Sequence, residues 1–178
     1  PVFRGKYLDN EQNLWNCVDP RFPQVREYLI GIYEKAAQEW KIDGFKLDFI
    51  DSFVLTPYTN TDSSGRDYES LEDAAERLLH DITARLRRLD PEVLLEFRQT
   101  YIGPVISQFG NMLRVNDCPL DATANRLGVL DLRLTSGRAA VHSDMITWNK
   151  GETDEGVAAQ LIAALFGVPQ ISVVLSEL

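Results

Sequence analysis

Segments with helical and with extended periodicity alternate along this chain, and that alternation restricts its fold more than any other feature. Apolar residues at three- and four-residue steps predict helices from Asp19 to about Trp40, Ser70 to about Leu89, and Thr153 to Phe166. Short apolar runs predict five strands, at Gly44–Phe49, Val93–Phe97, Asn111–Val115, Ala139–His142 and Gln170–Leu175. Strands that alternate with helices are joined by right-handed crossovers, so the sequence predicts an α/β protein with a parallel sheet.

Chain length separates two architectures of this class. A (β/α)8 barrel of the TIM type needs about 250 residues, whereas this chain has 178. Five strands in that length predict an incomplete barrel, roughly its C-terminal five strands, as a single partial barrel domain over residues 1–178. The alternative is an open doubly wound sheet, but no glycine-rich phosphate loop follows a predicted strand. Pro1, which is not an initiator methionine, looks like a cut end.

Composition narrows the classes of partner. A net charge of -9 argues against a nucleic acid or an anionic membrane surface as the partner. No apolar stretch reaches the roughly 20 residues of a membrane helix. Cys17 and Cys118 have no metal-site spacing, and no metal or cofactor is predicted. A reducing compartment such as the cytoplasm is the preferred expectation, with one disulfide as the alternative and the source compartment left open.

Charged residues recur where the predicted strands end. Lys46 and Asp48 point to one side of their strand, opposite Phe45, Leu47 and Phe49, because a strand has a period of two. Reactive residues of barrel enzymes lie at this end of the strands. Later strands carry charged pairs there, namely Glu96 with Arg98, Arg114 with Asp117, and His142 with Asp144. A structural salt bridge would explain one such pair. Their repetition favours a catalytic site at the ends of the strands, such as one with the paired carboxylates that cleave glycosides.

Two of these motifs resemble the alpha-galactosidase clan of glycoside hydrolases, especially glycoside hydrolase family 36 (melibiase-like). Phe45-Lys46-Leu47-Asp48 is similar to the clan's Lys-x-Asp nucleophile strand. Arg114-Val-Asn-Asp117, followed by Arg126, is similar to the later strand that carries the acid/base aspartate, and His142-Ser143 resembles the pattern on the next strand. The resemblance spans roughly residues 15 to 175 and implies a catalytic barrel fragment that cleaves terminal alpha-galactosides of an oligosaccharide.

The resemblance implies a role for each matching residue. Asp48 would be the nucleophile and Asp117 the acid/base of a retaining double displacement. Lys46 would bind sugar hydroxyls and keep Asp48 ionised, whereas Asp117 must be less readily ionised. The other substrate-binding candidates are Arg114, Glu96, Arg98, Trp15 and Trp148.

Several alternatives stay open. Family 31, the alpha-glucosidase and alpha-xylosidase group, shares the Lys-x-Asp-Phe pattern, although its following glycine is missing here. Leu47 and Ile50 replace a tryptophan and an asparagine of family 36, which leaves the exact sugar open. Asp121 is a rival proton donor, but it also fits an N-cap of a helix that begins near Ala122.

A further alternative is an inactive, carbohydrate-binding barrel fragment. An incomplete barrel also has open strand edges, and such edges pair with other chains. We therefore expect a homo-oligomer or rearranged loops to cover Gly44–Phe49 and Gln170–Leu175.

Overall fold

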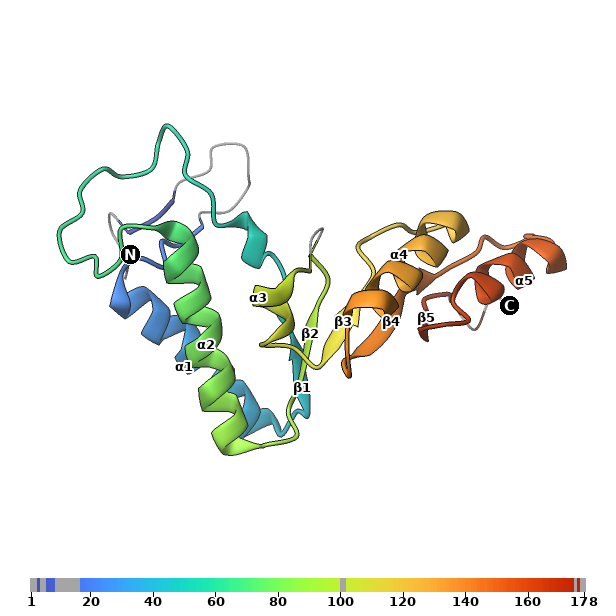
Figure 1. Cartoon of the computed structure of the whole chain (residues 1–178), viewed down its shortest axis with the longest axis horizontal. Helices are drawn as coiled ribbons and strands as arrows, with labels where there is room; N and C mark the ends of the chain where they lie inside the picture. Colours follow the sequence, from blue (N-terminus) through green and yellow to red (C-terminus); the bar gives the residue numbers. More distant parts are fainter. Residues whose placement is uncertain (1–2, 4–5, 9–16, 100–101, 175, 177–178) are drawn as a thin grey trace. The chain divides into compact units, whose positions relative to one another are not determined.

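A computed structural model describes residues 3, 6–8, 17–99, 102–174 and 176, and it shows an α/β fold (Figure 1). In that part of the chain, five strands form one sheet in the order β1-β2-β3-β4-β5, and β2 to β5 pair in parallel. This confirms the predicted fold class, a partial (β/α) barrel. The elements are α1 (Pro23–Trp40), β1 (Gly44–Lys46), a 3-10 turn (Ile50–Ser52), α2 (Leu71–Leu89), β2 (Leu94–Phe97), α3 (Pro104–Ser107), β3 (Met112–Arg114), α4 (Ala122–Thr135), β4 (Ala140–Ile146), α5 (Asp154–Ala163) and β5 (Val168–Ile171).

The chain divides into two compact units. Unit 1 comprises Pro1–Phe45 and Phe49–Val93, and unit 2 comprises Lys46–Asp48 and Leu94–Leu178. Unit 1 therefore holds α1 and α2, whereas unit 2 holds β2 to β5 with α3, α4 and α5. The single domain expected over residues 1–178 stays a prediction.

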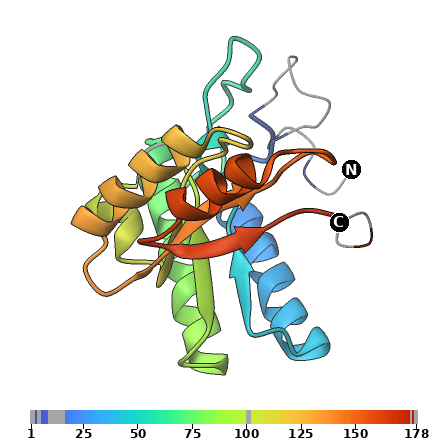
Figure 2. The same ribbon diagram turned by 90° about the vertical axis from the view of Figure 1, so that its right-hand side faces the viewer.

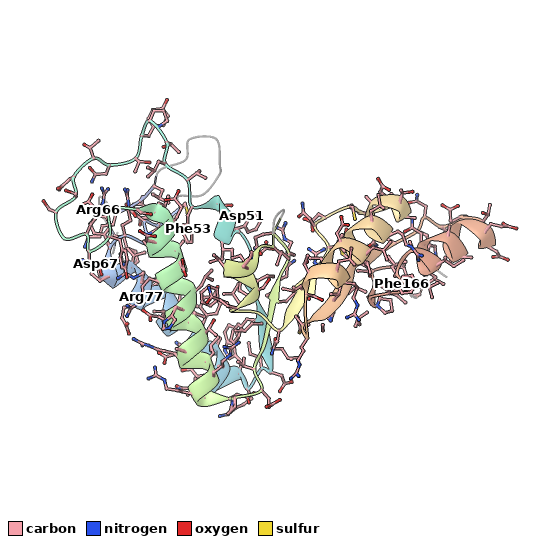
Figure 3. All side chains as sticks on the ribbon, viewed as in Figure 1. Asp51, Phe53, Arg66, Asp67, Arg77 and Phe166 are labelled. Carbon is pink, nitrogen blue, oxygen red and sulfur yellow. The ribbon has the colours of Figure 1, made fainter. Side chains whose placement is uncertain are left out.

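In unit 1, ion pairs tie the long loop before α2 to the start of α1. Arg26 Nη2 lies 2.5 Å from Asp67 Oδ2, and Arg66 Nη2 lies 3.4 Å from Oδ2 of the fully buried Asp19. Arg66 Nη2 also donates to the carbonyl of Asn60 at 2.7 Å. Arg66 and Asp67 are labelled on this loop in Figure 3. These contacts hold the segment between the 3-10 turn and α2 against the residues that lead into α1.

The helix α2 follows an N-cap at Ser70, the residue at which the sequence predicted its start. The Ser70 side chain accepts a hydrogen bond from the Asp73 N–H, which satisfies one of the free donors of the first turn. Near the other end of α2, Arg85 pairs with Glu27 and Glu34 of α1 at 2.6 and 3.1 Å. The two helices thus pack together within unit 1.

In unit 2, α4 packs against β3, β4 and α5 (Figure 2). Val115, Val129 and Val141 form the buried cluster between this helix and the sheet. A Cβ at Gly128 would lie 2.5 Å from Val115 Cγ1, so only glycine permits this close approach. The packing fixes the strand edge from which Arg114 and Asp117 emerge.

Three predicted strand boundaries are wrong. β1 ends at Lys46, because Phe49 adopts a left-handed conformation (φ 55°) that opens the 3-10 turn, and its side chain is 56% exposed rather than buried. β4 continues past His142 to Ile146 through a register shift between His142 and Met145. β5 begins at Val168, two residues early, and accepts Pro169 because an edge strand tolerates a missing donor.

Candidate active site

The site lies in unit 2, at the edge where its parallel strands end. Glu96 is paired in register with Met112, and Arg114 with His142, so their side chains lie on neighbouring strands. Glu96 Oε1 lies 3.8 Å from Arg114 Nε, and Glu96 Oε2 lies 3.4 Å from His142 Nδ1. Gln170 from β5 adds its amide, 3.3 Å from Glu96 Oε2 and 3.0 Å from His142 Nδ1. Four strands thus contribute one layer of polar side chains.

Arg98 joins the two predicted catalytic carboxylates. Its Nη2 lies 2.5 Å from Asp48 Oδ1, and its Nη1 lies 3.4 Å from Asp117 Oδ2. Lys46 Nζ lies 3.4 Å from the other oxygen of Asp48. Retaining carboxylate pairs stand about 5–5.5 Å apart and inverting pairs about 6.5–9.5 Å. Asp48 and Asp117 thus contact the same guanidinium, an arrangement that is compatible with either range.

Arg114 holds Asp117 from the opposite side. It is nearly inaccessible, and its Nη2 donates to Asp117 Oδ1 at 2.7 Å, while its Nη1 contacts Asp144 Oδ1. Together with Glu96, three carboxylates surround this one guanidinium. A buried cation needs such partners, because desolvation otherwise makes its charge costly.

Asp144 lies inside β4, not after it, and it is fully buried. Ser143 and Asp144 are both buried, although successive side chains of a regular strand point to opposite faces. The register shift between His142 and Met145 makes this possible. Besides Arg114, its carboxylate accepts the Cys118 N–H at 2.6 Å.

The buried Asn125 of α4 fixes the backbone of this segment. Its side-chain oxygen accepts the Asp144 N–H at 2.9 Å, and its amide donates to the Asp144 carbonyl at 3.2 Å. Asp144 is thereby anchored to α4 while it contacts Arg114 and Cys118. The two residues that flank the Asp117 turn are thus tied to one buried carboxylate.

Asp117 is more readily ionised than the predicted mechanism requires. The hydrogen bond from Arg114 has the largest effect and lowers its pKa, burial comes second and raises it, and the charges of Arg114, Arg98 and Lys46 lower it further. Its side chain is 53% exposed. The expectation of a less readily ionised Asp117 is wrong, because the cations Arg114, Arg98 and Lys46 favour its charged form.

The structure brings together six of the eight predicted site residues: Asp48, Asp117, Lys46, Arg98, Arg114 and Glu96. Trp15 lies outside the described residues. Trp148 instead lines a separate pocket near the ends of β4 and β5. The rival Asp121 caps α4, since its carboxylate accepts the Ala124 N–H at 2.8 Å.

Sequence reasoning gave no role to Gln170, Asn125 or Asp144 beyond the place of Asp144 near a strand end. A polar residue within an apolar strand was the available signal for Asp144 and Gln170.

Cys17 and Cys118 are free thiols, and burial raises the pKa of Cys118 to about 11. In the described part of the chain no cluster of His, Cys, Asp and Glu is suited to a metal ion. None of the described helices has the length and apolar character that crossing a bilayer requires.

Two solved structures share the fold of this chain. The glycoside hydrolase domain of PelA from Pseudomonas aeruginosa matches with a TM-score of 0.58 and 20% sequence identity, over 95% of this chain and 68% of that one. The E218A variant of the same domain matches with a TM-score of 0.56, also at 20% identity and with the same coverage. At this level of identity the likeness shows a shared fold. The sequence matches no protein-family model and no curated protein.

Proposed function

We propose that this chain is the catalytic barrel portion of a retaining glycoside hydrolase that removes terminal alpha-galactosyl residues. One observation carries the proposal: Arg98 contacts both Asp48 and Asp117, from two different strand exits. The fold, shared with a known glycoside hydrolase domain, and the resemblance of the two motifs to family 36 support it.

The mechanism is a double displacement. The Asp48 carboxylate attacks the anomeric carbon while Asp117 gives its proton to the glycosidic oxygen, which leaves as an alcohol. Asp117, now ionised, then takes a proton from water, and the water oxygen attacks the anomeric carbon and releases Asp48. Lys46 and Arg98 bind hydroxyls of the sugar beside Asp48, whereas the buried Arg114, itself paired with Glu96, positions Asp117.

Arg98 must give up its present contacts when substrate binds. Its guanidinium contacts the oxygen of Asp48 that could attack and also an oxygen of Asp117. Moving it onto a sugar hydroxyl exposes both carboxylates, and it removes one of the cations that keep Asp117 ionised. Substrate binding thus favours the protonated form of Asp117 that the first step requires.

Hydrolysis assays test the proposal directly. We expect the 178-residue chain to hydrolyse nitrophenyl alpha-galactoside faster than the alpha-glucoside or alpha-xyloside, with the alpha-anomer of galactose formed first in NMR spectra. Preference for alpha-glucoside or alpha-xyloside would favour the family 31 alternative. A first product of inverted configuration, or no hydrolysis of any glycoside, would refute the retaining mechanism for this chain.

The pH dependence of activity should report the cations around Asp117. In the free enzyme, kcat/KM falls on the alkaline side when the proton donor, Asp117, loses its proton. Arg98 helps to lower the pKa of Asp117. The substitution Arg98→Gln should move this alkaline limb to higher pH, whatever it does to the maximal rate. Arg138→Gln, an exposed arginine of unit 2, serves as the control. A limb that stays in place or moves to lower pH would contradict the role of Asp117.

A further inference from the structure

A small pocket lies at the ends of β4 and β5, the two strands that carry His142 and Gln170 of the candidate active site. Its walls come from the segment after β4, including Trp148 and Asn149, and from the segment after β5, including Ser172. Its volume is about 240 Å³. The two segments are joined by the Ser172 N–H, which donates to the Ile146 carbonyl at 2.9 Å. Because β4 and β5 are parallel, both walls rise from the carboxyl ends of their strands, where barrel enzymes bind substrate.

The wall chemistry suits a sugar ring. Trp148 offers a flat apolar indole, and the neighbouring hydroxyls and amide of Thr147, Asn149 and Ser172 can donate and accept hydrogen bonds. A pyranose has the matching surface, with a face of C–H groups and hydroxyls around its rim. The described lining contains one cation, Lys150, and no carboxylate. A single positive charge is too little to bind a polyanion. The volume is below the 300–1,000 Å³ range of pockets for larger ligands, so one ring is the fitting size.

The chain connects this pocket to the proposed catalytic residues. Trp148 follows Asp144 by four residues on the same segment, and Asp144 contacts Arg114, which binds Asp117. We propose that the pocket is a second sugar subsite, which binds a pyranose of an oligosaccharide substrate other than the one whose bond is attacked. This inference rests on the proposed function and adds to it a preference for oligosaccharides.

Two substrates of different length separate this role from a structural one. Alpha-galactosyl fluoride fills only the catalytic subsite, whereas a galactose-terminated trisaccharide reaches further. Trp148→Ala should lower kcat/KM for the trisaccharide on the order of tenfold, mainly through KM, and leave the fluoride within about twofold. Trp148→Phe should restore most of the loss, because it keeps an aromatic face. Trp40→Ala, an exposed tryptophan of unit 1, is the matched control.

The outcomes distinguish the subsite from the catalytic proposal. Equal losses for both substrates would assign Trp148 a structural role, and no loss for either would exclude the subsite. If the unmodified chain hydrolyses neither substrate, the proposed function fails. Calorimetric titration with the trisaccharide then tests the subsite independently of catalysis. Binding that Trp148→Ala weakens and Trp40→Ala does not would still support the subsite, whereas absent or unchanged binding would overturn it.

Discussion

Replacing Asp48 by asparagine should abolish glycoside hydrolysis, with a loss in kcat on the order of 10⁴-fold or more. An amide cannot form the glycosyl ester of the first step, although it has nearly the shape of the carboxylate. Steady-state assays on nitrophenyl alpha-galactoside measure the loss. Asp51→Asn, an exposed acidic residue three positions later, is the matched control and should keep full activity. Residual activity above about a tenth would remove Asp48 from the role of nucleophile.

Chemical rescue gives a sharper test of the same residue. In Asp48→Gly the missing side chain leaves room for azide, which attacks the anomeric carbon of an activated alpha-galactoside and expels nitrophenolate. Because the attack comes from the face that Asp48 would use, the expected product is beta-galactosyl azide. An alpha-configured azide would place the nucleophile elsewhere. Azide that rescues Asp117→Gly in the same way, to the beta product, would exchange the two predicted roles.

The elements with strong periodicity could be predicted from the sequence, and the strand ends could not. The two-residue period placed Lys46 and Asp48 on one side of the chain, and the two form an ion pair in the structure, although Asp48 lies beyond the end of β1. Nothing local marks Phe49 as left-handed, because aromatic residues rarely adopt that conformation. The register shift in β4 also has no local signal, although it decides that Asp144 is buried.

The electrostatics of the site depend on partners distant in sequence. Arg98 and Asp48 are 50 residues apart, and Arg114 and Asp144 are 30 apart. Sequence reasoning placed charged pairs where strands end and expected them to share one rim, but it assigned no ion pair between residues of different strands. In the structure the partners lie across strands, so Arg114 serves three carboxylates and lowers the pKa of Asp117. Parallel strands bring their ends to one edge, but the choice among several nearby charges depends on packing.

Asp144→Ala should destabilise the protein strongly. The change leaves the buried Arg114 without one of its carboxylates and the Cys118 N–H without its acceptor. Removing one partner of a buried ion pair costs about 3–5 kcal/mol, and the remaining contacts of Arg114 with Glu96 and Asp117 favour the lower end. Urea unfolding followed by circular dichroism measures the difference.

Two further variants separate charge from packing at this position. Asp144→Asn keeps an oxygen for the Cys118 N–H and nearly the same volume, so it should lose less stability than Asp144→Ala while still weakening the hold on Arg114. Asp121→Ala removes only the N-cap of α4 and should cost about 1 kcal/mol. If Asp144→Ala costs no more than Asp121→Ala, Asp144 is not the anchor of the turn that carries Asp117. The position of that turn would then depend on Arg98 and Arg114 alone.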